Sequence, residues 1–128
     1  MSFPQHRPRR LRQSPAVRRL VRETHVVPSQ LVLPLFVREG IASPVPIGSM
    51  PGVVQHTIDS LRAAVVDAAA AGIGGVMLFG VPATRDAVGS GADDPAGILN
   101  VATHAVAAEV GDALVVQTDL CLDEFTDH

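Results

Sequence analysis

The chain has 128 residues, of which 47% are hydrophobic, and this suits one soluble globular domain. Its single cysteine excludes an internal disulfide framework and favours a reducing compartment, and no apolar run is long enough to span a membrane. We therefore expect a cytoplasmic protein without a membrane partner. All ten basic residues are arginine, so no side chain offers a lysine amine as a nucleophile.

Charge is divided unevenly along the chain. Residues 1–22 contain seven arginines and no acid, whereas residues 23–128 contain three arginines and all thirteen acids. A basic arm before an acidic body is compatible with nucleic-acid binding, with a transit peptide, or with docking on the acidic body of a neighbouring subunit. Pro4, Pro8 and Pro15 interrupt a long amphipathic helix, and the arm has no Tyr or Trp to stack on bases. We favour subunit docking and expect no nucleic-acid partner.

The first predicted elements are short. Apolar residues at helical spacing (Val17, Leu20 and Val21) predict a helix within 16–23, and an apolar run predicts a strand over 30–37. We place residues 1–28 in a basic arm and residues 29–128 in the main body. Glycines and prolines recur through residues 38–56, which predicts a long loop of the kind that often serves function.

The rest of the chain alternates helices and strands. Thr57 is a candidate helix N-cap, apolar residues follow at helical spacing, and Gly72 is expected to end that helix. Residues 75–81 form a near-continuous apolar run, as in a parallel strand that is covered on both faces. After a second loop over 82–91, Asp94 and Pro95 predict the start of another helix, which Gly111 ends before a strand over 113–118.

This order of elements predicts two βαβ crossovers and an α/β fold with about three strands and two to three helices. Strands that begin near residues 31, 75 and 113 suit a barrel with elaborated loops. A complete (β/α)₈ barrel takes about 250 residues, so this sequence accounts for only the first part of one.

A polar segment, residues 119–128, follows the last predicted strand, where α/β folds gather their ligands. In an extended chain Asp119, Cys121 and Asp123 share one face, and Leu120 and Leu122 back them from the other. Two carboxylates around a thiol suggest a partial metal site, with His128 as a further candidate ligand. A small, inert thiol beside acids is the alternative, and the spacing leaves both open.

Five segments, in this order and spacing, resemble the amino-terminal part of the porphobilinogen synthase family, also called 5-aminolevulinate dehydratase. They are Leu33–Val37, Ser49–Val53, Val76–Pro82, Gly89–Ala92 and Asp119–His128. The resemblance implies the first part of a TIM barrel and an arm that wraps a partner subunit, usually in an octamer. It also implies a lyase that condenses two 5-aminolevulinate molecules to porphobilinogen, with loss of two waters, in tetrapyrrole (haem) biosynthesis.

The resemblance also assigns residues. Asp119 matches an aspartate that lines the active site. Cys121 matches the first cysteine of the family's zinc site, and Asp123 stands where zinc-dependent members have the second, so the resemblance implies a divalent metal, zinc or magnesium. The family binds its substrates to two lysines as Schiff bases, and this sequence has none. We therefore expect a fragment that is inactive alone; the alternative is an autonomous, non-catalytic module that binds a partner subunit or a metal through its arm and acidic C-terminal segment.

Overall fold

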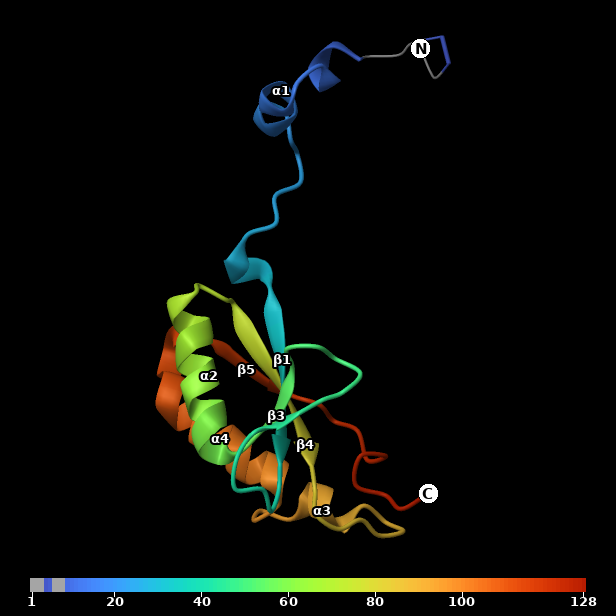
Figure 1. Ribbon diagram of the computed structural model, residues 1–128, viewed down its shortest axis with the longest axis vertical. Coiled ribbons are helices and arrows are strands. Elements are labelled where there is room, and N and C mark those ends of the chain that lie inside the picture. The colour runs from blue at the N-terminus through green and yellow to red at the C-terminus, as the bar shows by residue number, and fades with distance from the viewer. Residues whose placement is uncertain (1–3, 6–8) are drawn as a thin grey trace.

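A five-stranded sheet organises the computed structural model, which describes residues 4–5 and 9–128 (Figure 1). The strands lie in the order β2-β3-β1-β4-β5, and all run parallel except β2. Their bounds are β1 Val32–Arg38, β2 Val45–Pro46, β3 Val54–His56, β4 Gly75–Val81 and β5 Val115–Thr118. Because parallel strands end at the same edge, the segments that follow β1, β4 and β5 are brought to one end of the molecule.

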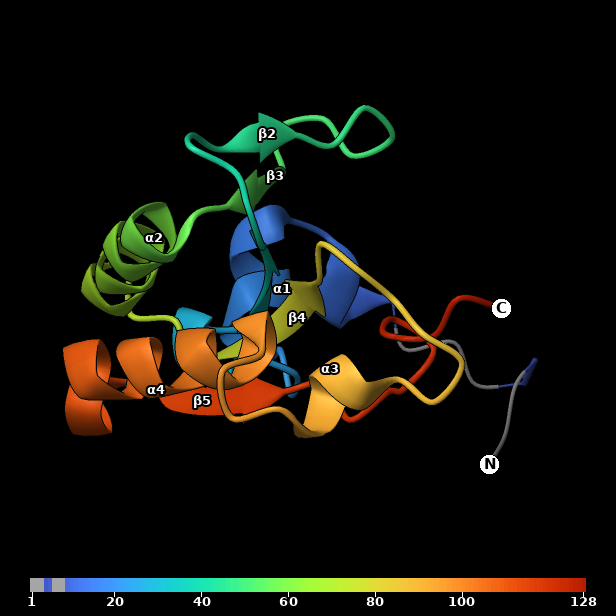
Figure 2. The ribbon, with the colours of Figure 1, turned by 90° about the horizontal axis from the view of Figure 1, so that it is seen from below.

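Two long helices, α2 (Ile58–Ala70) and α4 (Ile98–Val110), cover the same face of the sheet (Figures 1 and 2). Side chains from both helices and from the central strands β1 and β4 form the buried core, whose fully buried members include Val37, Leu61, Val65, Val76, Leu78 and Val106. At the surface of this layer the guanidinium of Arg62 on α2 lies 2.7 Å from a carboxylate oxygen of Glu109 on α4. The body is thus one sheet with one helical layer.

Helix α2 and strand β4 confirm the prediction. The Thr57 hydroxyl oxygen accepts a hydrogen bond from the backbone N–H of Ser60 at 3.1 Å, which satisfies one free donor of the first turn. The helix ends at Ala70, and Gly72 follows with a φ of +75°, the left-handed conformation that often terminates helices. Strand β4 spans Gly75–Val81, as the apolar run predicted.

The predicted start of the next helix is wrong. Asp94 and Pro95 precede α4, which begins at Ile98 with Gly97 as its N-cap. The Asp94 carboxylate instead accepts from the backbone N–H of Ala96 at 2.8 Å, and its carbonyl oxygen accepts from Gly97 N–H and from the Asn100 amide. These bonds stabilise a separate turn before the helix. A short helix, α3 (Ser90–Asp93), begins at the end of the predicted loop, and Gly111 caps α4 as expected.

The prediction of a loop over 38–56 is also wrong in part. Strand β2 pairs antiparallel with β3, and β3 pairs parallel with the end of β1, where Phe36 faces Gln55. These strands have two and three residues, too few to produce a visible alternation of apolar side chains. In the described residues the sheet therefore has five strands rather than three, and β1 is paired on both sides.

The described part of the arm extends away from the sheet (Figure 1). It contains the 3₁₀ turns η1 (Arg10–Arg12) and η2 (Pro28–Gln30) and helix α1 (Pro15–Leu20), which is shorter than the predicted helix. Ser14 caps α1 by accepting from the backbone N–H of Val17 at 3.2 Å. No side chain between residues 9 and 30 is buried, and Leu20 is 84% exposed. Arg7, one of the seven arginines of residues 1–22, and Pro8, one of the three prolines expected to interrupt a helix, lie outside the described residues.

Candidate functional site at the end of strand β5

The polar segment leaves the sheet directly after β5. The backbone N–H of Asp119 donates to the carbonyl of Leu78 at 3.1 Å, which extends the pairing with β4 by one residue. Beyond it the chain turns over residues 122–125. The expected alternation therefore fails: Leu120 is fully exposed and Leu122 is 56% exposed, so neither leucine backs the polar residues. Strand β5 ends at Thr118, so the side chains of residues 119–123 do not alternate between the two faces of the sheet.

Two of the expected site residues nevertheless come together. The Cys121 thiol donates a hydrogen bond to the Asp123 carboxylate, and both side chains are exposed. This hydrogen bond raises the pKa of Cys121, and the negative charges of Asp123 and Asp119 contribute in the same direction. The thiol therefore keeps its proton while the neighbouring carboxylates are charged and no cation is bound.

The thiol and carboxylate provide two donor groups of the kind that divalent metals bind. They fit two positions of a coordination shell, and a bound cation would replace the proton that Cys121 shares with Asp123. His128 does not join them: its Nδ1 lies 3.4 Å from a carboxylate oxygen of Asp127. Within residues 4–5 and 9–128, no three His, Cys, Asp or Glu side chains gather as a metal-binding group. The pair is thus an incomplete site.

Glu124 is a feature that the sequence analysis did not single out. One of its carboxylate oxygens is buried without a hydrogen-bond partner, and the side chain is half-buried. Burial raises the pKa of Glu124, as do the nearby carboxylates of Asp119 and Asp123, while Arg85 acts in the opposite direction. Its position next to Asp123 was visible in the sequence, but its burial depends on how the chain turns over residues 122–125.

Phe125 anchors the turn and was also missed. It is 2% exposed, and its ring lies against β4 and the start of α4, where Gly80 leaves room for it. A Cβ at Gly80 would lie 2.9 Å from the Leu99 side chain and 3.3 Å from the Phe125 ring, closer than side chains normally approach. A small cleft of about 120 Å³ beside this ring is lined in part by Asp119 and Cys121. This cleft is smaller than most ligand pockets, which usually measure about 300 Å³ or more.

With this geometry established, comparison with known proteins identifies the chain. The family model for delta-aminolevulinic acid dehydratase matches residues 5–128. The chain belongs to the delta-aminolevulinic acid dehydratase family. The family suggested by the five sequence segments is thereby confirmed.

Delta-aminolevulinic acid dehydratases from Streptomyces and Mycobacterium are similar to this chain over nearly its whole length. The Streptomyces coelicolor enzyme is 59% identical over 129 residues, which cover 99% of this chain and 39% of the relative. The enzyme of Mycobacterium tuberculosis strain H37Rv is 60% identical with the same coverage. The chain thus spans about two fifths of the length of the curated relatives that it matches.

A solved structure extends the comparison to the fold. The delta-aminolevulinic acid dehydratase (porphobilinogen synthase) of Toxoplasma gondii ME49, crystallised with the reaction product porphobilinogen, has a TM-score of 0.86 and 35% sequence identity to this chain. The similarity covers 96% of this chain and 35% of the Toxoplasma chain. The α/β prediction is confirmed, and the sheet and its helical layer correspond to part of a dehydratase of this family.

Proposed function

We propose that this chain forms part of a porphobilinogen synthase, a hydro-lyase that condenses two 5-aminolevulinate molecules to porphobilinogen in tetrapyrrole (haem) biosynthesis. The observation that carries the proposal is the family match over residues 5–128, supported by relatives about 60% identical. The polar groups after β5 stand where an α/β enzyme collects its substrate contacts. 5-Aminolevulinate is the proposed substrate.

The chain's own residues support only part of that chemistry. Asp119 is the proposed active-site lining residue: it follows directly on β5, and its carboxylate could orient a cationic amine. Schiff-base formation requires a free amine, and this sequence has no lysine. We therefore propose that the chain alone is inactive. The absent lysine is also what favours the second candidate function, a non-catalytic module that binds a partner or a metal.

The proposed metal ligands are the Cys121 thiolate and the Asp123 carboxylate, which are in contact. A thiolate favours zinc, whereas carboxylate and water favour magnesium, so the mixed pair is compatible with either cation. A cation bound there would act as a Lewis acid toward a carbonyl oxygen of the substrate. The thiolate and the carboxylate would hold and orient this cation.

For the arm we propose a role in homo-oligomer formation. Residues 9–22 of the arm contain six arginines and no acid, and none of the arm's described side chains is buried against the body. The body carries twelve of the thirteen acids, so the arm of one chain and the body of another are complementary in charge. Among the described residues no helix is long and apolar enough to cross a membrane. We propose a cytoplasmic location.

A chimera tests the proposed enzyme function. The segment of the Mycobacterium tuberculosis relative that matches this chain is replaced by residues 1–128, and porphobilinogen formation from 5-aminolevulinate is measured. We expect an active chimera, and no product from the 128-residue chain alone. The matched variant Asp119→Ala should lower kcat/KM of the chimera, whereas Asp112→Ala, on an exposed turn before β5, should not.

The chimera and the module hypothesis give different results. A chimera that has the size and circular-dichroism spectrum of the relative but makes no porphobilinogen would contradict the enzyme proposal. Product formation by the chain alone would contradict the proposed need for lysine side chains that this chain does not supply.

The arm is tested by replacing all its arginines with glutamine in the chimera, which should lower the molecular mass measured by light scattering.

A further inference from the structure

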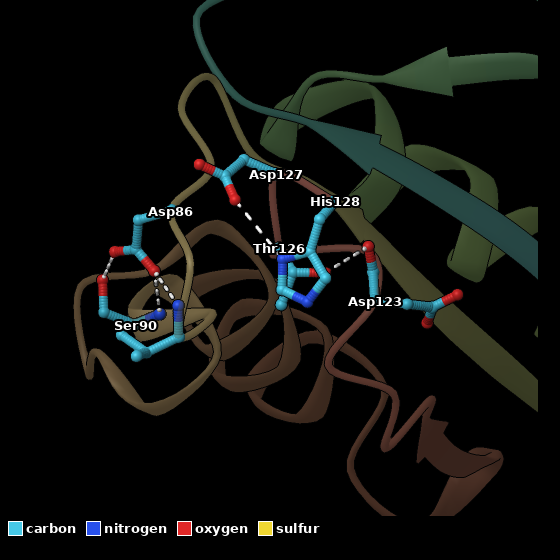
Figure 3. Close-up of polar contacts among 7 residues, drawn as sticks. Asp86, Ser90, Asp123, Thr126, Asp127 and His128 are labelled. Atoms are coloured by element: carbon cyan, nitrogen blue, oxygen red, sulfur yellow. Dashed lines mark hydrogen bonds and ion pairs between the residues drawn. The ribbon is translucent and has the colours of Figure 1, made fainter.

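The backbone of Asp86 forms hydrogen bonds that join the loop after β4 to the segment after β5. Its backbone N–H donates to the carbonyl of Phe125 at 3.3 Å, and its carbonyl accepts from the N–H of Asp127 at 3.2 Å. Asp86 and Thr126 form an isolated parallel bridge. Figure 3 shows Asp86 on one side and Asp127, Thr126 and Asp123 on the other. Both backbone groups of Asp86 therefore hold the C-terminal segment in place.

The carboxylate of Asp86 shapes the loop that makes this contact. One oxygen accepts from the backbone N–H groups of Val88 and Ser90, at 3.0 and 3.1 Å, and the other accepts from the Ser90 hydroxyl (Figure 3). These hydrogen bonds, that of the Ser90 hydroxyl first, lower the pKa of Asp86. The carboxylate is therefore charged at neutral pH and able to accept all three bonds.

A glycine in the same loop allows the two segments to approach closely. Gly89 is buried and has a φ of +65°, a conformation that other residues rarely adopt. A Cβ at this position would lie 3.3 Å from the Thr126 side chain and 3.4 Å from the Leu122 carbonyl oxygen. The left-handed turn at Gly89 lies within the loop that Asp86 organises, so the fit against residues 122–126 depends on that loop.

We propose that Asp86 is a positioning residue for the Cys121–Asp123 pair. It touches neither side chain and acts through the segment it holds. The hydroxyl of Thr126 donates to the Asp123 carbonyl at 3.4 Å, and Thr126 is the residue bridged to Asp86. Phe125, buried beside it, fixes the other side of the turn. The functional meaning of this arrangement, though not its geometry, rests on the metal role proposed above.

The test uses the 128-residue chain and two readouts. Cobalt(II) is titrated while the thiolate-to-cobalt absorption band is recorded, with Cys121→Ser as the blank. Hydrogen exchange measured by mass spectrometry compares residues 121–127 with α2. The variants are Asp86→Ala, Asp86→Asn and Asp94→Ala. Asparagine keeps one oxygen for the two backbone N–H groups, and Asp94 supports a neighbouring turn with no hydrogen bond to residues 119–128.

Asp86→Ala is expected to weaken cobalt binding about tenfold. The turn would then be less ordered in the free chain, and binding would have to restore the order of about one residue. It should also speed exchange in residues 121–127 without changing α2. Asp86→Asn and Asp94→Ala should resemble the unmodified chain. Equal binding and exchange in Asp86→Ala and the unmodified chain would overturn the proposal, and so would a loss of protection throughout α2, because Asp86 would then support the whole body.

The two readouts separate this proposal from the metal role. If the unmodified chain gives no thiolate band, the proposed metal ligands are wrong, and the exchange measurement alone decides whether Asp86 positions the turn. Faster exchange confined to residues 121–127 supports positioning in that case, and unchanged exchange refutes it.

Discussion

The aromatic rings of Phe36 on β1 and Phe79 on β4 stack with their centroids 5.2 Å apart and their planes inclined by 26°. The two residues are register partners in the parallel ladder. Their neighbours Leu35, Val37 and Leu78 point into the core beneath α2 and α4, so the stacked pair stands on the other face of the sheet. Both rings are half-buried, and the first residues of β1 are exposed.

We predict that this pair couples energetically although the helices do not cover it. Stacked aromatic pairs contribute about 0.5–1.5 kcal/mol beyond the area they bury. A double-mutant cycle with Phe36→Ala and Phe79→Ala, measured by urea unfolding, should give a coupling energy in that range. The pair Phe36→Ala and Val106→Ala serves as the additive control, because Val106 belongs to α4 in the core on the other side of the sheet from the Phe36 ring. Additive costs for Phe36 and Phe79 would contradict the prediction.

The cap of α2 provides a second prediction. Replacing Thr57 by alanine removes the acceptor of the Ser60 N–H, and we expect a loss of about 1 kcal/mol in the free energy of unfolding. Thr57→Ser retains the hydroxyl oxygen and should lose much less. Chemical denaturation of the three proteins measures the difference. Equal losses in both variants would show that the methyl group, not the cap, stabilises the helix start.

His56 should make stability depend on pH. Burial lowers the pKa of His56. The unfolded chain therefore binds a proton at this residue near pH 6.5, whereas the folded chain binds it only at a lower pH. Stability is therefore expected to fall as the pH drops below that value, until the folded imidazole also becomes protonated. The decrease in Tm between about pH 7.5 and pH 5.5 should be smaller in His56→Gln. His104→Gln, an exposed change on α4, should keep the full decrease.

Zinc binding by the chain should be weak. The described residues provide a thiol and a carboxylate in contact, and structural zinc sites use four ligands. We expect calorimetry to give a Kd weaker than about 1 µM. Asp123→Cys should tighten zinc binding, because a second thiolate is a softer ligand, and Cys121→Ser should weaken it. A tighter Kd for the unmodified chain would reveal a complete site.

Local signals in the sequence predicted the elements that depend on local chemistry. The apolar run of β4 and the Thr57 cap of α2 both lie where the residues indicated. The signal at Asp94 misled because the Asn100 side chain and Gly97 N–H bind its carbonyl and create a separate turn. Both outcomes depend on hydrogen bonds to near neighbours in sequence, which cap a helix at Thr57 but close a separate turn at Asp94.

The candidate site was predictable in its chemistry but not in its geometry. The sequence indicated that Cys121 and Asp123 belong together, and the structure places them in contact. It gave no sign of the contacts that hold them, because Asp86 and Gly80 lie far from Phe125 in sequence and become its neighbours only in the folded chain. Asp119 was placed correctly at the end of β5, while its role in a reaction stays a prediction.

The pairing of β1 with β4 also has a consequence for synthesis of the chain. Every residue of β1 faces a residue of β4, from Val32 opposite Gly75 to Arg38 opposite Val81, and α2 lies between the two strands in sequence. Strand β4 begins 43 residues after the start of β1, so β1 leaves the ribosome before β4 is available to pair with it. Its apolar residues then remain available to chaperones or to other nascent chains. Slower translation after β1 has left the ribosome and before β4 has left it should increase aggregation, whereas slower translation after β4 has left it should not.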